Sequence, residues 1–451
     1  MARRGRAGVA GARGTARRSP LDGIAAVPAR LMGPMLVVVA ASAFLLVLGF
    51  LMIYSASAPS ALADTGDAAY FLKRQVGLAA GGLLLALAIV RGGYRRWCGD
   101  WLMVVSVPVL VLLLVTLAAG IASHGAQRWI EVAGVRVQPA EFAKVTVILA
   151  VAGLAERRLV RDDVSPLSLL GQGLAYVGAP VALVLFQPDK GSAGIIVLTV
   201  FLMLLMAGIP WYWVAGSLVA CGVAFCVLVF RDAYSLSRVV AALDPWADPY
   251  GVGYQLVHGF FAFAKGGVMG VGVGFSQQKY SYIPEAHNDF IFAIVGEELG
   301  LVGTLGVVAA FAALGWGGFQ VARHAPDLSG RLVAAGCTSL LLIQFLVNAG
   351  GVLGLIPLSG KPLPFLSYGG SSVVACVSMV ALVVSVARAS ELPETSHDRR
   401  RRQMSLVGDA PARTAPQLRV HDGGRARQGR PPRIDLGPGP ADRLRPRDGR
   451  R

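Results

Sequence analysis

A small number of charged and polar side chains lie within or beside long apolar segments of this chain, and they are the first candidates for chemistry. A charge at the centre of a membrane helix costs about 2.5–3.5 kcal/mol on insertion scales, so each one needs a reason. One group comprises Arg128, Arg136, Gln138, Glu141 and Lys144. A proline two residues before Glu141 suits the first turn of a helix, which makes Glu141 and Lys144 neighbours at i, i+3. The group is either a polar pocket whose cations meet an anionic head group or an interfacial ion pair with an extended lysine.

Two aspartates lie where apolar segments begin. Asp189, in a turn between two such segments, is expected to cap the helix that follows it. Asp289 ends a polar segment and directly precedes an apolar run. Its carboxylate is either an acid favoured by the helix dipole or a loop base beside the membrane surface. Glu297 and Glu298 lie deeper in the same run, where each needs a hydrogen-bonding partner inside the bundle.

The segment 348–372 is unusual because it combines many glycines and three prolines with an apolar composition. Irregular backbone at membrane depth is tolerated only where it is buried in protein or lines a cavity. The segment therefore predicts a site without defining its chemistry. The glycines at 270, 272 and 274 follow no predicted strand, so they do not indicate a dinucleotide-binding loop.

The positive charge of the chain is concentrated at its two ends. The sequence has 451 residues, of which 55% are hydrophobic and 15% are charged, and its formal net charge is +16. A soluble protein carries about 25% charged residues, and this shortfall excludes an ordinary cytosolic enzyme. Residues 1–34 contribute +6 and residues 388–451 contribute +8. No aromatic residues interleave these arginines, so the basic composition does not indicate a nucleic-acid-binding protein.

The uncharged stretches between the two ends predict an all-α integral membrane protein, a bundle of ten transmembrane helices. The predicted spans are 35–54, 75–90, 101–127, 140–155, 164–186, the two halves of 191–230 divided at 208–210, 290–319, 332–360 and 362–387. The Arg-rich tails, 1–34 and 389–451, have a disordered composition, and the positive-inside rule places both in the cytoplasm. The membrane domain, 35–388, then has a large extracytoplasmic loop, about 231–289, between spans 7 and 8.

Two stretches, taken in order with the group around Arg128, resemble the SEDS family (shape, elongation, division, sporulation), the FtsW/RodA-type peptidoglycan polymerases. The first reads PEAHNDFIFA from Pro284 and GEELG from Gly296, and the second runs from Pro357 to Ser372. The resemblance covers about residues 35–388, and the first stretch is more similar to division-type than to elongation-type members. Lys190 and Lys361 depart from the family pattern.

The resemblance implies a glycosyltransferase that polymerises lipid II, a polyprenyl-diphosphate-linked glycan, at the outer face of the bacterial cytoplasmic membrane. The acceptor 4-hydroxyl attacks the anomeric carbon and the lipid diphosphate leaves, which requires a base and cationic groups. Asp289 corresponds to the family's proposed catalytic aspartate. The predicted substrate-binding residues are Arg128, Arg136, Gln138, Glu141, Lys144, Lys73, Arg74, His287, Ser367 and Ser371.

The resemblance also implies a class B penicillin-binding protein (a transpeptidase), other division proteins and the membrane as partners, no nucleic acid, and a location at the division septum. A divalent cation, Mg²⁺ or Mn²⁺, could share the diphosphate with the arginines, although no motif requires one. Three alternatives stay open. They are a flippase that moves lipid II without chemistry, an elongation-type polymerase, and a scaffold whose tails recruit division proteins.

Overall fold

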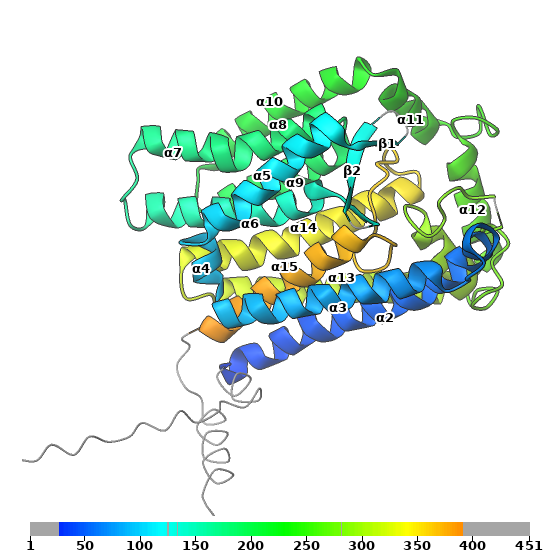
Figure 1. Ribbon diagram of the computed structural model, residues 1–451, viewed down its shortest axis with the longest axis horizontal. Helices are drawn as coiled ribbons and strands as arrows, with labels where there is room; N and C mark the ends of the chain where they lie inside the picture. Colours follow the sequence, from blue (N-terminus) through cyan, green and yellow to red (C-terminus); the bar gives the residue numbers. More distant parts are fainter. Residues whose placement is uncertain (1–26, 124–125, 133, 281, 391–451) are drawn as a thin grey trace, which may run out of the picture. The chain divides into compact units, whose positions relative to one another are not determined.

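The computed structural model of the chain describes residues 27–123, 126–132, 134–280 and 282–390. Within these residues the chain forms a bundle of helices and one small antiparallel sheet (Figure 1). The first predicted tail lies outside the described residues up to residue 26, and the second lies outside them from residue 391.

The helices follow the apolar stretches of the sequence and end where glycine, proline or charge interrupts them. They are α2 (Ala29–Thr65), α3 (Tyr70–Gly92), α4 (Tyr94–Cys98), α5 (Leu102–Ala119), α6 (Pro139–Leu159), α7 (Pro166–Gly173), η1 (Leu174–Gly178), α8 (Ala179–Phe186), α9 (Lys190–Met206), α10 (Trp211–Phe230), α11 (Ala233–Leu243), α12 (Tyr254–Gly266), α13 (Ile291–Arg323), α14 (Leu328–Val352) and α15 (Gly370–Ala389). The predicted division of the run 191–230 is confirmed, since α9 ends at Met206 and α10 begins after Pro210.

The bundle of membrane helices predicted from the sequence is confirmed. Eight helices among the described residues are long and apolar enough to cross a membrane. The two other predicted spans correspond to α6, which has 21 residues, and α9, which has 17. α6 carries charges at both ends and is buried along most of its length, as expected of a helix surrounded by other helices. The number of ten spans therefore stays a prediction.

The last two predicted spans, 332–360 and 362–387, are shortened, because α14 ends at Val352 and α15 begins at Gly370. Three further segments differ from the sequence-based expectation. The first helix is longer than 35–54, because the Ala- and Ser-rich residues that follow continue it to Thr65. The predicted span 101–127 ends at Ala119, before a glycine, and the chain then forms β1 (Ile121–Ser123), β2 (Ala126–Val132) and β3 (Val135–Val137) in the order β1-β2-β3. The predicted loop 231–289 contains α11 and α12. All three depend on how side chains pack rather than on hydropathy.

Helix α13 is interrupted at Gly300, whose φ of 66° and ψ of −160° are not helical. The break leaves the carbonyls of Glu297 and Glu298 without helical partners, and the backbone N–H groups of Val271 and Gly272 donate to them at 3.0 Å each. A side chain at Gly300 would collide with the backbone of the segment after α12. The loop after α12 thus supplies the hydrogen bonds that the interrupted helix lacks. Irregular backbone is tolerated inside a membrane protein where other parts of the protein supply such bonds.

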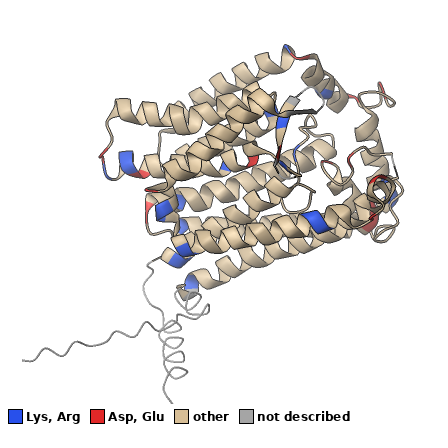
Figure 2. Ribbon diagram, in the orientation of Figure 1, with Lys and Arg blue, Asp and Glu red and all other residues tan. Residues whose placement is uncertain are grey.

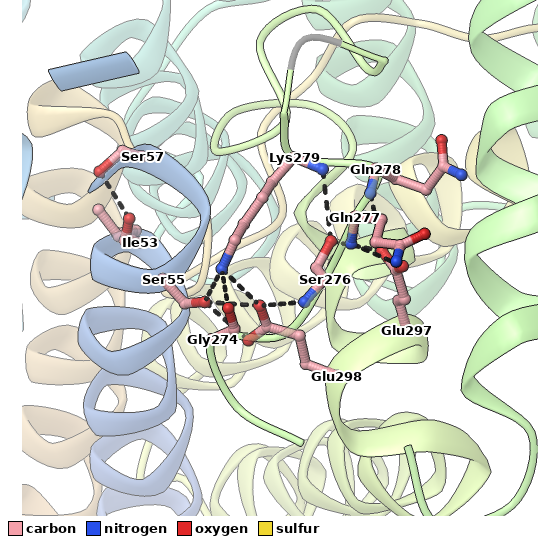
Figure 3. Close-up of polar contacts among 10 residues, drawn as sticks. All are labelled: Ile53, Ser55, Ser57, Gly274, Ser276, Gln277, Gln278, Lys279, Glu297 and Glu298. Carbon is pink, nitrogen blue, oxygen red and sulfur yellow. Dashed lines mark hydrogen bonds and ion pairs between the residues drawn. The ribbon is translucent and has the colours of Figure 1, made fainter. Parts of the chain in front are cut away.

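Five polar side chains beside this break form what we call the kink cluster: Ser55, Ser276, Lys279, Glu297 and Glu298 (Figure 3). The Lys279 ammonium lies 3.2 Å from a Glu298 carboxylate oxygen, and the Ser55 hydroxyl donates to the same oxygen at 2.6 Å. Glu297 accepts hydrogen bonds from the Ser276 hydroxyl and from the backbone N–H groups that follow it. All five side chains are buried, and the prediction that both glutamates find partners in the bundle is confirmed.

The irregular segment 353–369, between α14 and α15, is held tightly against α2. Any side chain at Gly49 of α2 would collide with the carbonyl oxygen of Phe365, so the contact requires a glycine. Within the segment, the Ser367 hydroxyl accepts from the backbone N–H of Leu363 at 2.8 Å and donates to the carbonyl of Asn288 at 2.6 Å. The segment is therefore a fixed wall beside the loop that ends in Asp289.

Candidate active site

A cavity of about 740 Å³ lies between the small sheet, the start of α3, the loop before α13 and the segment 353–369. Ligand-binding cavities of small molecules usually measure roughly 300–1,000 Å³. Its charged lining residues are Arg74, Arg128, Glu131, Arg136, Arg238, Glu285, Asp289 and Lys361. Five of these are cations and three are carboxylates, so the cavity has an excess of positive charge that favours an anionic ligand.

The small sheet and α3 position the arginines of this cavity. β2 pairs with β3 so that Glu131 lies opposite Arg136, which brings both to one ladder beside the cavity. Arg128, earlier on β2, donates to the carbonyl oxygen of Pro188. Arg74 of α3 donates to the hydroxyl of Tyr70, one turn earlier, at 2.8 Å. Each guanidinium keeps further donors for an anion, because it carries five N–H groups.

Asp289 is fixed through its backbone. The side-chain amide of Asn348 donates to the Asp289 carbonyl oxygen at 2.9 Å, and the N–H of Tyr368 donates to the carbonyl of His287 at 2.9 Å. Within the described part of the chain, the Asp289 carboxylate itself accepts no hydrogen bond and forms no ion pair. A Cβ at Gly360 would lie 3.2 Å from one of its oxygens. The carboxylate thus faces the cavity with its lone pairs available.

Burial raises the pKa of Asp289 above its ordinary value, and the positive charges of Lys361 and Arg238 act in the opposite direction. A carboxylate whose pKa is raised toward the working pH is a stronger base than an ordinary aspartate. A perturbed carboxylate in a cavity is a feature of catalytic sites.

Lys361, which lines the cavity, forms a buried ion pair with Asp189, with 2.5 Å between the ammonium and the carboxylate. The predicted helix cap is confirmed, since Asp189 also accepts from the backbone N–H of Ser192 at 3.0 Å. The amide of Gln138 donates to its second oxygen at 3.2 Å. Burial alone would raise the pKa of Asp189, but the charges of Lys361 and Arg128 lower it to about 2. Asp189 therefore stays ionised as the counter-ion of Lys361.

The structure brings several of the predicted site residues together and leaves others outside. Lining the cavity are Arg74, Arg128, Arg136, Gln138 and Asp289. The predicted residues that do not line it are Lys73, Glu141, Lys144, His287, Ser367 and Ser371. The roles predicted for all of them remain predictions.

Glu141 and Lys144 form the predicted i, i+3 ion pair, with 2.7 Å between the charged atoms. Their side chains are only 1–2% exposed, and the Lys144 ammonium also donates to the Gln344 side chain at 2.7 Å. The interpretation of an interfacial pair with an extended lysine is therefore wrong, because both side chains are buried inside the bundle.

The remaining predicted residues have other contacts. Lys73 pairs with Asp67 on the surface, with 2.7 Å between the charged atoms. The His287 ring packs against Phe71, with ring centroids 4.7 Å apart. The Ser371 hydroxyl accepts from the backbone N–H of Gln138 at 2.8 Å, which ties the start of α15 to the residue before α6. These contacts support the walls of the cavity.

Sequence reasoning missed Arg238 and Lys361 as cavity residues. In the sequence, Lys361 stands out only as a departure from the family pattern, although a lysine in an apolar, proline-rich segment is itself a signal for a buried counter-ion. Arg238 lies on α11, inside what the hydropathy pattern gave as a loop. Arg238 reaches the cavity because α11 lies beside the segment 353–369, where its guanidinium donates to the carbonyl of Leu358.

No group of three or more His, Cys, Asp or Glu side chains in the described part of the chain could hold a metal ion. The carboxylates of the cavity are thus not arranged as a protein-built metal site. The divalent cation considered above stays a prediction, and the chemistry proposed below does not depend on it.

Charged residues are distributed unevenly over the described helices (Figure 2). Basic residues gather at the end of the bundle that contains α4, while the lengths of most helices carry few charges. The exceptions include the side chains of the cavity, those of the kink cluster and the buried Glu141–Lys144 pair of α6. An uncharged bundle with a polar cavity at one end defines a multi-pass membrane protein with an internal site for a polar ligand.

Comparison with known proteins identifies the family. The family model described as a cell cycle protein of the FtsW/RodA/SpoVE group matches residues 35–392, and the chain belongs to this family. Stage V sporulation protein E of Bacillus subtilis is 37% identical over 79% of this chain and 98% of its own length. A probable peptidoglycan glycosyltransferase FtsW of Trichlorobacter lovleyi is 36% identical over 81% of this chain and 95% of its own length.

Two solved structures share the fold. A chain of a peptidoglycan synthase complex that coordinates polymerization and crosslinking matches with a TM-score of 0.62 and 30% identity, over 78% of this chain and 96% of its own. The Thermus thermophilus Rod shape determining protein RodA matches with a TM-score of 0.56 and 29% identity, over 79% of this chain and 97% of its own. The described bundle is therefore that of the family.

Proposed function

We propose that this chain is a peptidoglycan glycosyltransferase that polymerises lipid II into glycan strands during cell division. The observation that carries the proposal is the Asp289 carboxylate, which has no partner in the described part of the chain and lines a cavity with excess positive charge. The names of the FtsW relatives support the glycosyltransferase activity and the division role.

In the proposed reaction, the 4-hydroxyl of the acceptor sugar attacks the anomeric carbon of the donor. Its proton passes to the Asp289 carboxylate as the new C–O bond forms, and the bond to the lipid diphosphate breaks. A positioned base of this kind accelerates a reaction by about 10²–10⁴-fold. Arg74, Arg128 and Arg136, which line the same cavity, stabilise the negative charge that grows on the departing diphosphate.

The proposed location is the bacterial cytoplasmic membrane at the division septum, with both termini in the cytoplasm and the cavity at the outer face. The support is the basic residues at the α4 end of the bundle, which the positive-inside rule assigns to the cytoplasm. A class B penicillin-binding protein is the proposed partner, together with other division proteins. The synthase complex, which couples polymerization to crosslinking, supports this assignment.

The decisive experiment measures glycan polymer made from lipid II by the purified full-length protein in detergent, with and without a penicillin-binding partner. A flippase would make no polymer. Asp289→Asn is expected to abolish polymer formation, and Asp163→Asn serves as the control because that aspartate is exposed at the other end of the bundle. Polymer formation at the wild-type rate by Asp289→Asn would overturn the assignment of the base.

A further inference from the structure

A second hollow, of about 340 Å³, lies directly beside the cavity. We call it the tyrosine hollow, and the lining residues used in the argument are Tyr234, Arg238, Tyr250, Tyr254 and Gln255. Three of these, Tyr234, Arg238 and Gln255, line the cavity as well. The two spaces are therefore adjacent, and Arg238 stands at the boundary between them.

The two spaces differ in charge. Among the described residues that line the tyrosine hollow, Arg238 is the one charged side chain, against eight in the cavity. Its guanidinium is already engaged, because it donates to the carbonyl of Leu358 at 2.8 Å and lies 4.6 Å from the ring centroid of Tyr234. Among its described lining residues, the hollow therefore has a single cation, which it shares with the cavity, where the cavity has five, and it suits an uncharged polar ligand better than a phosphate group.

The hollow offers rings and hydroxyls together. Tyr250 is 92% exposed, and Tyr254 is held in place by the His258 ring, with centroids 4.3 Å apart. A tyrosine presents an apolar face and a polar edge on a side chain with little freedom to lose. A pyranose ring has the matching surface, since its C–H groups form an apolar face and its hydroxyl and amide groups form a polar rim.

The backbone that carries Tyr250 is pre-formed. The Asp244 carboxylate accepts from the N–H of Trp246 at 3.0 Å, and the Asp248 carboxylate accepts from the N–H of Gly251 at 2.9 Å. These side-chain turns fix the loop between α11 and α12 without any ligand. Binding at a pre-formed surface costs less conformational entropy than binding that must order a loop.

We propose that the tyrosine hollow is a subsite for the uncharged sugar units of the growing glycan strand. The inference rests on the proposed function. A polymerase that adds one unit after another has to hold its product between additions, and the sugars next to the reacting one carry no diphosphate. A neutral hollow that adjoins a cationic cavity matches that order of groups along the strand. Contacts in the hollow thus set how many additions occur before the strand is released.

The test compares the length of glycan strands made from lipid II by the full-length protein and its variants. Tyr250→Ala is expected to shorten the mean strand by about 2- to 10-fold. The same variant is expected to leave the initial rate of joining the first two lipid II molecules unchanged. Tyr250→Phe keeps the ring and is expected to restore most of the length. Tyr212→Ala is the matched control, because Tyr212 is an exposed tyrosine on α10 outside both spaces.

Unchanged strand lengths in both Tyr250→Ala and the double variant with Tyr254→Ala would overturn the subsite. So would an equal loss in the rate of the first coupling, because that result would mean a general defect rather than a hold on the strand. Failure of the wild-type protein to make any polymer would instead overturn the proposed function. The two failures are therefore distinguishable in one experiment.

Discussion

The cavity and the kink cluster each contain a buried pair of a lysine and a carboxylate, yet the two regions differ in what surrounds the pair. In the kink cluster, Lys279 and Glu298 are buried together with Ser55, and the carboxylates of both glutamates accept hydrogen bonds from neighbouring residues. At the cavity, the lining residue Lys361 pairs with Asp189, while Asp289 lines the same cavity and its carboxylate has no partner among the described residues.

A buried charge alone therefore does not mark a functional site in this bundle. The kink cluster uses its charges to hold an interrupted helix, and the donors and acceptors balance there. The cavity keeps an imbalance, with more cations than carboxylates and no partner for the Asp289 carboxylate among the described residues, in a space that a ligand can enter. Removal of a charge is therefore expected to reduce folding stability in the first region and the reaction rate in the second.

The largest expected effect on stability is that of Lys279→Met. It leaves the Glu298 carboxylate buried without its counter-ion, and breaking a buried pair in this way costs about 3–5 kcal/mol. The midpoint of thermal unfolding in detergent is expected to fall sharply. Lys265→Met is the control, since Lys265 is an exposed lysine at the end of α12. An unchanged midpoint for Lys279→Met would contradict the structural role assigned to the kink cluster.

The next effect is that of Lys361→Met, which breaks the other buried pair. Asp189 keeps the N–H of Ser192, the amide of Gln138 and the nearby positive charge of Arg128, so the loss of stability is expected to be smaller, about 1–3 kcal/mol. The rate of polymerisation per folded molecule is expected to fall by about 10-fold or more, because the cavity loses positive charge. A variant that loses stability but keeps its rate would make the two regions alike.

The pH dependence of polymerisation tests whether Lys361 acts on the charge of Asp289. Because burial raises the pKa of Asp289, the fraction of ionised base is expected to fall as the pH is lowered through a value above that of an ordinary aspartate. Lys361 opposes this shift, so Lys361→Met is expected to move the acid limb of the rate profile to higher pH. A limb that stays in place would show that the two groups do not interact.

The sequence predicts a site residue where its neighbours in the chain already indicate its role, and it fails where the role depends on a residue far away in the chain. Asp289, Arg128 and Arg136 were recognisable because each is a charge beside apolar residues. The pairing of Asp189 with Lys361 was not, because the two residues are far apart in the sequence and meet only through packing. Hydropathy also predicted most of the helices but not the small sheet, whose first strand lies within an apolar run.

The smallest expected effect is that of Lys73→Ala. The sequence made Lys73 a candidate for the diphosphate, but its ammonium pairs with Asp67 on the surface. Exposed pairs of this kind contribute little, and the rate is expected to change by less than about twofold. Arg74→Ala, one residue further along α3, is the matched comparison, because Arg74 lines the cavity and its loss is expected to lower the rate. Equal rates for the two variants would contradict the placement of Arg74 inside the cavity and of Lys73 outside it.

The most direct measurement is the rate of glycan formation from lipid II per folded molecule for Asp289→Asn and Glu297→Gln, with the unfolding midpoint of each. Asp289→Asn is expected to keep the wild-type midpoint and lose about 10²–10⁴-fold in rate. Glu297→Gln places an amide among three donors, so it is expected to lower the midpoint and keep the rate. A wild-type rate for Asp289→Asn would contradict the assignment of the catalytic carboxylate.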